Sequence, residues 1–288
     1  MRVTTPRPVV VAMLVAALAL TWAIRAHADG AVNIAACQVL NSPNTVYRLT
    51  ADLVSSSDCL VVGADRITID LQGHSITGTG NAIFGFAAVT DQGRGHDLIV
   101  VKNGIPGALS GFFYGISLES TRSSVISVEA SGNIGTGIRV PGARVLVKSS
   151  VAHGNNQGIS AEGDRAQIQQ SDASNNAVLG ISAGAHCLVT MNTANNNSPN
   201  AENGYGIATN GGGGCTISFN TASGNGIAGI LTGGAGNLVT QNTAMGNGTD
   251  DFVLDCPGDV TFNTSSLGFP ASYRFFNPAA TCRTANNQ

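Results

Sequence analysis

The basic side chains of this chain are distributed very unevenly along the sequence. Five of them fall close together: Arg122, Arg139, Arg144, Lys148 and Arg165. After them no Lys or Arg occurs until Arg274. A cationic side chain can bind an anionic group through charge-assisted hydrogen bonds, and with a lowered pKa it can act as a base. Chemistry on an anionic ligand therefore has to use this stretch or residues nearer the amino terminus.

Three of these arginines recur at matching positions. Arg122, Arg144 and Arg165 each lie six residues after the isoleucine of a Gly-Ile pair. If the connecting turns match in length, the three side chains stack along one edge about 5 Å apart. Like charges so close repel unless acidic groups or a polyanion lie between them, and Glu119 and Glu162 are placed to neutralise them. We interpret the three arginines and Glu162 as a binding groove for an acidic polysaccharide; the alternative is a solvated turn with weak salt bridges.

An internal repeat predicts the elements that position these residues. The phrase Ala, any residue, Gly or Asn, then Asn recurs at Ala130–Asn133, Ala152–Asn155, Ala173–Asn176, Ala194–Asn197, Ala222–Asn225 and Ala244–Asn247, in steps of 22, 21, 21, 28 and 22 residues. A β-branched apolar residue stands five positions before each of these alanines, and an apolar residue, usually in a Gly-Ile pair, follows each phrase. Three columns of residues therefore repeat together.

Short strands separated by Gly and Asn at this period predict an all-β solenoid of about eight to ten coils. Gly and Asn are weak helix formers, and the apolar residues alternate, so a helical solenoid fits poorly. The repeated Asn side chains are predicted to form an internal hydrogen-bonded ladder from Asn133 to Asn247. On the outer surface of the later coils we expect a flat uncharged face that contains Asn192, Asn220 and Asn242 with Thr190, Ser218 and Thr240. Such a face could bind a neutral glycan or an ordered water layer; the alternative is that it is simply solvated.

These columns resemble the right-handed parallel β-helix of the pectate lyase-like superfamily. The resemblance runs from about Val46 to Thr264, and the phrase Ile67–Gly78 looks like the first full coil of many secreted β-helix proteins. It implies the fold. The superfamily contains lyases, hydrolases, epimerases, adhesins and periplasmic proteins that assist maturation of a metalloenzyme, so the resemblance leaves the function open.

Lyases of this kind hold calcium against a uronate with acidic side chains, while an Arg or Lys removes the C5 proton. The resemblance implies Glu129 and Asp172 as calcium ligands and Arg139 and Lys148 as candidate bases, so these four are the candidate catalytic residues. A galacturonase-like hydrolase pattern is represented only by the Asp250-Asp251 pair, and the motifs that should accompany it are missing.

A second candidate calcium site lies near the end of the repeats. Asp250, Asp251, Asp255 and Asp259 supply hard oxygen ligands close together in sequence. The alternative is that these carboxylates cap the last turn or lie free on the surface. His96, His153 and His186 occupy unrelated positions and predict no metal cluster.

The amino-terminal residues 1–28 read as a secretory signal peptide, with basic residues, an apolar run and an Ala-His-Ala cleavage site. Residues 29–45 are expected to cap the amino-terminal end of a solenoid over 46–264, and residues 265–288 to cap the other. Of fifteen possible cysteine pairings, sequence order and location favour Cys37 with Cys59, Cys187 with Cys215, and Cys256 with Cys282. Six cysteines in an exported chain favour such disulfides.

The sequence thus favours a secreted or periplasmic monomer that engages a polysaccharide. Lyase-like processing of an acidic glycan is the enzymatic form of this hypothesis, and calcium is its candidate cofactor. The alternative is a non-catalytic scaffold, a surface-interaction protein or a periplasmic accessory protein. A net charge of −3 favours neither a nucleic-acid partner nor an anionic membrane. No membrane span is expected once the signal peptide is cleaved.

Overall fold

The computed structural model of the chain describes residues 30–79, 85–198, 204–268, 271–277 and 281–288. The expected signal peptide at 1–28 lies outside the described residues. Two compact units are distinguished, Met1–Gly30 and Ala31–Gln288, and the account below concerns the second. Within the described residues no helix has the length and apolar character that crossing a membrane requires.

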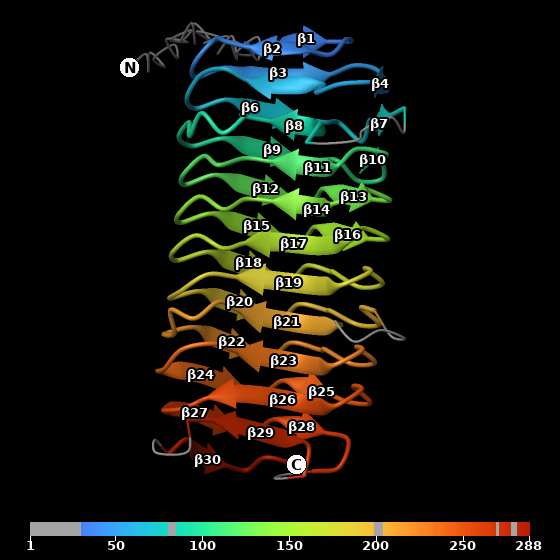
Figure 1. The fold of residues 1–288 in the computed structure, drawn as a ribbon. Helices are drawn as coiled ribbons and strands as arrows, with labels where there is room; N and C mark the ends of the chain where they lie inside the picture. The colour runs from blue at the N-terminus through green and yellow to red at the C-terminus, as the bar shows by residue number, and fades with distance from the viewer. Residues whose placement is uncertain (1–29, 80–84, 199–203, 269–270, 278–280) are drawn as a thin grey trace, which may run out of the picture. The chain divides into compact units, whose positions relative to one another are not determined.

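The unit Ala31–Gln288 is a solenoid of parallel strands, in which each coil contributes one strand to each of two long sheets and shorter pairings to a third (Figure 1). The 12-stranded sheet contains β1 (Val32–Ile34), β3 (Val46–Leu49), β6 (Thr68–Asp70), β9 (Val100–Lys102), β12 (Ser124–Ile126), β15 (Leu146–Lys148), β18 (Gln167–Gln169), β20 (Leu188–Thr190), β22 (Thr216–Ser218), β24 (Asn237–Thr240), β27 (Gly258–Thr261) and β30 (Arg283–Ala285). The 11-stranded sheet contains β2 (Gln38–Leu40), β5 (Leu60–Val62), β8 (Ala87–Thr90), β11 (Tyr114–Ser117), β14 (Thr136–Arg139), β17 (Gln157–Ala161), β19 (Leu179–Ala183), β21 (Tyr205–Thr209), β23 (Ala228–Thr232), β26 (Asp250–Asp255) and β29 (Tyr273–Phe276).

The third sheet is narrower, because its strands are short and become single bridges in the middle coils. It contains β4 (Leu53–Ser55), β7 (Ile76–Gly78), β10 (Ala108–Ser110), β13 (Glu129–Ser131) and β16 (Val151–His153), and later β25 (Thr243–Ala244) and β28 (Thr264–Ser265). Bridges through Asp172, Thr193 and Thr221 join the two parts. The fold class predicted from the repeat is confirmed, and the solenoid has more coils than the sequence predicted.

The core is built from like residues stacked coil over coil. Val125 pairs with Val147, Val147 with Ile168, and Ile168 with Val189 in the 12-stranded sheet. These four side chains are fully buried. The columns recognised in the sequence are therefore the inward-facing columns of the sheets, and burial of their apolar surface is the main stabilising contribution.

The predicted Asn ladder is present in the turn that leads into the 11-stranded sheet. From Asn133 to Asn247 each Nδ2 donates to the Oδ1 of the Asn one coil further on, at 3.0, 3.3, 3.2, 3.0 and 3.0 Å. The same oxygens also accept a backbone N–H, for example Asn155 N to Asn176 Oδ1 at 3.1 Å. The ladder therefore satisfies polar groups that a tight interior turn would otherwise leave unpaired.

A second ladder overturns one expectation. Asn192, Asn220 and Asn242 were expected on the outer face, but they are only 2%, 1% and 1% exposed. They hydrogen-bond one another inside the solenoid, with Nδ2 to Oδ1 distances of 3.0 and 2.9 Å. The expectation was wrong because the residue before each Asn has a positive φ, as at Met191 (57°) and Phe219 (57°). That bend reverses the strand alternation on which the expectation relied.

The ends of the solenoid continue its pairing. In the segment expected to be an amino-terminal cap, β1 pairs parallel with β3 and β2 pairs parallel with β5. At the other end β29 pairs with β26 and β30 pairs with β27. Parallel pairing therefore extends past both expected boundaries, at 46 and at 264.

Three disulfides join the pairs favoured by the sequence, and the described chain has no free cysteine. Cys37–Cys59, Cys187–Cys215 and Cys256–Cys282 have Cα separations of 4.4, 4.5 and 5.1 Å. Each bridge links neighbouring coils, because stacking brings equivalent positions within the reach of a disulfide. Disulfides of this kind are typical of proteins that fold in an oxidising compartment.

Candidate functional site

The best-placed group of predicted residues lies in a polar groove on the outer face of the 11-stranded sheet. The groove has a volume of about 460 Å³ and is lined by Phe113, Tyr114, Ile134, Gly135, Thr136, Arg139, Asn156, Gln157, Ser160 and Glu162. Strands β11, β14 and β17 of three consecutive coils supply half of this lining, and residues next to these strands supply the rest. The groove therefore combines a cation, a carboxylate, two aromatic rings and several uncharged hydrogen-bonding groups.

Arg139 is the central cation of the groove. It points outward because its neighbour Ile138 is fully buried in the core. Its Nη1 donates to Ser117 Oγ at 3.2 Å and lies 3.1 Å from Glu119 Oε1. Its guanidinium carbon lies 5.6 Å from the centre of the Tyr114 ring. Both polar contacts use Nη1, so Nε and Nη2 can donate to a ligand while the ring restricts the position of the guanidinium.

Glu162 lies across the groove from Glu119. In the register of the parallel strands, Arg139 lies beside Ser117 of the coil before it and beside Ser160 of the coil after it. Glu119 and Glu162 each follow their serine by two residues, so they are two coils, or about 10 Å, apart. Glu162 Oε1 accepts a hydrogen bond from Ser182 Oγ at 2.9 Å. Glu119 is therefore bound to Arg139, whereas Glu162 is held on the far side by a neutral group.

The three stacked arginines occupy the corner where the 11-stranded sheet turns into the 12-stranded sheet, and we call Arg122, Arg144, Arg165 and the following His186 the Arg corner. Arg122 N donates to Ala143 O at 2.9 Å, Arg144 N to Asp164 O at 2.8 Å, and Arg165 N to Ala185 O at 2.9 Å. Their φ angles are 51°, 58° and 59°. The turn lengths thus match, as the stacking prediction required.

Acidic partners at the Arg corner differ from those expected. Arg122 Nε lies 2.9 Å from Asp97 Oδ1, and this guanidinium, followed by the Thr121 hydroxyl, lowers the pKa of Asp97. Asp164 lies 2.6 Å from His186 Nδ1 and 3.5 Å from Arg165 Nε. The hydrogen bond with His186 is the largest cause that lowers the pKa of Asp164.

The neutralising carboxylates are therefore Asp97 and Asp164. The expectation that Glu119 and Glu162 would take this role was wrong, because both carboxylates bind groups on the sheet instead. Arg144, exposed at the middle of the corner, makes no ion pair with any described residue. It is therefore available to an external anion.

The four candidate catalytic residues do not share a cleft. Arg139 lies on β14 of the 11-stranded sheet, whereas Lys148 lies on β15 of the 12-stranded sheet. Glu129 and Asp172 lie in the third sheet, where Glu129 Oε1 is 3.3 Å from His153 Nε2 and Asp172 Oδ1 accepts from Ser174 Oγ at 2.5 Å. A lyase needs its base and calcium ligands around one sugar carbon, and this arrangement does not provide that.

Comparison with family models agrees with this architecture. A family model described as "Right handed beta helix region" matches residues 108–244. The chain is a right-handed parallel β-helix. Among solved structures, the Dettilon tailspike protein (gp208) is similar with a TM-score of 0.38 and 15% identity, over 81% of this chain and 42% of the tailspike chain. The β-helix thus spans less than half the length of that protein. Among curated proteins none matches the sequence.

The aspartates near the end of the β-helix bind separate partners and do not converge on one site. Asp250 Oδ2 lies 2.7 Å from Arg274 Nη2, and Asp255 Oδ2 accepts from Gly234 N at 2.8 Å. Asp251 is 3% exposed and accepts from Asn247 Nδ2 at 2.8 Å. In the part of the chain that the structure describes, no group of three or more His, Cys, Asp or Glu is placed to hold a metal ion. These aspartates connect turns of the β-helix.

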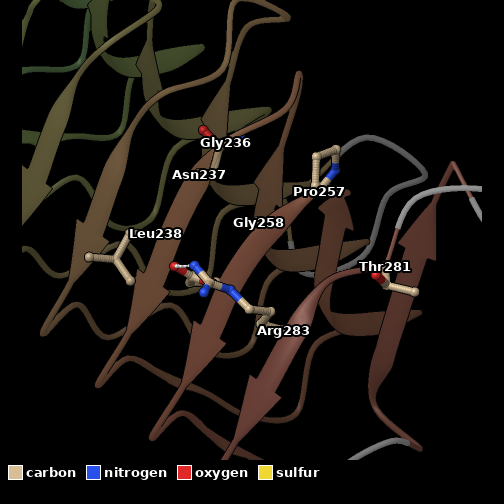
Figure 2. A pocket seen from close by; sticks show the side chains of 8 residues that line it. Gly236, Asn237, Leu238, Pro257, Gly258, Thr281 and Arg283 are labelled. Atoms are coloured by element: carbon tan, nitrogen blue, oxygen red, sulfur yellow. Dashed lines mark hydrogen bonds and ion pairs between the residues drawn. The ribbon is translucent and has the colours of Figure 1, made fainter.

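A second hollow, of about 220 Å³, lies where the 12-stranded sheet approaches the carboxyl terminus (Figure 2). Arg283 and Asp259 lie in it, and the guanidinium binds the carboxylate through Nε at 2.6 Å and Nη2 at 2.8 Å. This fork-to-fork pairing uses both carboxylate oxygens and two of the guanidinium nitrogens. Arg283 is 84% exposed, but its guanidinium already has a carboxylate partner in Asp259.

Several groove residues were missed from the sequence, among them Tyr114, Ser117, Gln157 and Ser160. The sequence did contain a signal for them. Tyr114 and Gln157 stand immediately before Gly-Ile pairs, and Ser117 and Ser160 immediately after. These positions flank the buried Gly-Ile pairs of β11 and β17, so in these two strands the pair marks the residues at the groove.

Proposed function

We propose that the protein binds an acidic polysaccharide along the groove of the 11-stranded sheet and the adjoining Arg corner. The observation that carries this proposal is Arg139, which is held by Ser117 and Tyr114 with two guanidinium nitrogens left for a ligand. A planar guanidinium presents paired donors that match a carboxylate or sulfate. The surrounding Gln157, Asn156 and Ser160 supply neutral donors and acceptors suited to sugar hydroxyls.

The Arg corner extends this site along the solenoid axis. Arg144 follows Arg139 by five residues in the same coil, and Arg165 lies one coil further. Successive coils are about 5 Å apart, which is close to the length of one sugar unit in an extended polymer. A polyanion lying along the axis can therefore meet one basic side chain per coil.

The site binds rather than cleaves in this proposal. The candidate base Lys148 and the acidic residues Glu129 and Asp172 lie on other sheets than Arg139. The three disulfides support placing the protein in the periplasm or the extracellular space, where we propose that it acts as a monomer. Calcium is a candidate cofactor from the sequence, so binding is measured with and without it.

The test measures binding of the purified protein to alginate, polygalacturonate and a glycosaminoglycan, with and without calcium. We expect binding of at least one of them that weakens with added salt, since the contacts are ionic. Arg139→Gln and Arg144→Gln should each weaken it about fivefold to tenfold, whereas the matched control Lys148→Gln, on another sheet, should not. Lys148→Gln removes the same charge, and Gln169 occupies the equivalent position one coil on.

Two outcomes contradict the proposal. Absence of binding to all three acidic polymers would leave a scaffold as the better account. Equal loss in Lys148→Gln and Arg139→Gln would show attraction to overall charge instead of a site. Release of unsaturated products, followed by their absorbance, would show instead that the protein cleaves its ligand.

A further inference from the structure

A second surface of the β-helix has a composition opposite to that of the Arg corner. It lies on the 12-stranded sheet, where the outward residues of four consecutive strands, β18, β20, β22 and β24, are uncharged. They are Gln167, Gln169, Leu188, Thr190, Thr216, Ser218, Leu238 and Thr240. Lys148 precedes this surface, and the Asp259–Arg283 pair in Figure 2 follows it. The neutral surface is therefore bounded by charge at both ends.

Hydroxyl groups form rungs on this surface. Thr190 Oγ1 lies 3.1 Å from Ser218 Oγ, and Thr261 Oγ1 donates to Thr240 Oγ1 at 2.9 Å. Each hydroxyl retains a further donor or acceptor function after these bonds. The surface thus offers a regular row of hydrogen-bonding groups with the spacing of the coils, about 5 Å.

Bulky apolar side chains line one edge of the neutral surface, at the corner where the 12-stranded sheet turns into the third sheet. Met191, Phe219 and Phe262 are 55%, 50% and 56% exposed there. Gln241 lies between the two phenylalanines in the same column. We call Met191, Phe219 and Phe262 the apolar edge. About half of the surface of each side chain stays in water, and that half does not stabilise the fold.

The backbone at the apolar edge makes these residues more unusual. Met191, Phe219 and Phe262 have φ angles of 57°, 57° and 55°, a region that bulky side chains rarely adopt. In other coils the same corner holds small or polar residues: Asn103, Ser127, Ser149, Gln170 and Gln241. The fold therefore accepts a polar residue at this corner, and the apolar edge needs an explanation other than folding. Strain of this kind is found where a surface has a function.

We propose that the neutral surface and its apolar edge bind an uncharged, extended polysaccharide, independently of the acidic ligand at the groove. An aromatic ring can cover the apolar C–H face of a sugar, and the hydroxyl rungs can bond its hydroxyl groups. Phe219 and Phe262 are two coils, or about 10 Å, apart, close to the length of an extended disaccharide unit. Every second sugar of a chain lying along the axis then meets a phenyl ring.

The absence of charge selects this ligand. An acidic polymer would gain nothing on a surface without cations, and it would lose hydration of its carboxylates there. A neutral glycan carries repeating hydroxyls that match the repeating rungs. A protein with ligands on two faces would join an acidic and a neutral polymer.

The test measures depletion of the full-length protein from solution by microcrystalline cellulose and by chitin. The variant Phe219→Gln/Phe262→Gln is expected to fold, because Gln241 adopts the same conformation between these positions. We expect the wild-type protein to bind one of the two solids, and the variant to bind about tenfold more weakly. Molar salt should leave this binding unchanged, and so should Arg139→Gln. These two controls show whether binding at the neutral surface is independent of the proposed acidic site.

Three results would overturn this inference. In the first, the wild-type protein remains in solution with both solids, and in the second the variant binds as the wild type does. Either result removes the role of the apolar edge. In the third, the wild-type protein is a dimer in solution and the double variant a monomer, which would assign the surface to a second copy of the chain. Circular dichroism and thermal unfolding of the variant verify that it is folded.

Discussion

The guanidinium of Arg139 stacks over the ring of Tyr114 from the preceding coil, with 5.6 Å between the guanidinium carbon and the ring centre. The Tyr114 ring is itself held by Phe113, whose centroid lies 4.7 Å away in an edge-on arrangement. This packing limits the rotation of Arg139 before any ligand arrives. A side chain that is already ordered loses less conformational entropy on binding, which makes the pair important for the proposed acidic site.

Replacement of Tyr114 should therefore weaken binding of an acidic polysaccharide. We expect Tyr114→Ala to raise the dissociation constant about threefold to tenfold, since cation–π contacts at such exposure contribute about 0.5–1 kcal/mol and the arginine also becomes mobile. Tyr114→Phe retains the ring and should stay close to the wild type. Isothermal titration calorimetry measures both. If Tyr114→Phe lost as much affinity as Tyr114→Ala, the hydroxyl would matter more than the ring.

The Asn ladder gives a prediction on stability. Asn176 is 2% exposed, and its side chain donates to Ala152 O at 3.0 Å and to Asn197 Oδ1 at 3.2 Å, while its Oδ1 accepts from Asn155 N at 3.1 Å. Asn176→Ala leaves several of these buried groups without a partner, so we expect a loss of about 2–4 kcal/mol in the free energy of unfolding. Urea unfolding followed by circular dichroism measures it.

The exposed Gln167 provides the control for this ladder variant. Its side chain lies on the surface of the 12-stranded sheet, so Gln167→Ala should change the free energy of unfolding by less than about 0.5 kcal/mol. A loss in Asn176→Ala no larger than that in Gln167→Ala would mean that the ladder contributes little. In that case the turns would be held by their backbone hydrogen bonds alone.

The recurring columns show how far the sequence predicts this molecule. Stacking makes every coil repeat the same environment, so the inward Val125, Val147 and Ile168 and the first Asn ladder could be recognised by spacing alone. The second ladder could not, because its direction depends on a positive φ at residues such as Met191 and Phe219, which do not favour that conformation. The groove was only half found, since Arg139 was recognised by charge whereas Tyr114 and Gln157 carry no charge.

The glycine of each Gly-Ile pair has a structural reason that the sequence alone did not reveal. A Cβ added at Gly158 would lie 2.6 Å from Gly180 O and 2.7 Å from Asn176 Nδ2, so the first Asn ladder requires its absence. We expect Gly158→Ala to destabilise the protein by about 1–3 kcal/mol through this overpacking. Gly211→Ala is the matched control, because nothing lies within 4 Å of its Cβ position. Equal unfolding midpoints for the two variants would contradict this reason.

Stability at high pH should depend on Tyr273, whose ring stacks on Phe252 with 4.6 Å between centroids. Burial, with a further contribution from the charge of Asp251, raises the pKa of the Tyr273 phenol from 10.0 to about 12, although a hydrogen bond with Ser265 opposes the shift. Because the phenol ionises more easily in the unfolded chain, its contribution to stability is complete below about pH 10 and is lost as the pH rises towards 12. Tyr273→Phe has no proton to lose, so its unfolding midpoint in urea should fall less steeply between these pH values than that of the wild-type protein. Identical slopes for the two proteins would show that the phenol ionises equally easily in the folded and unfolded chains.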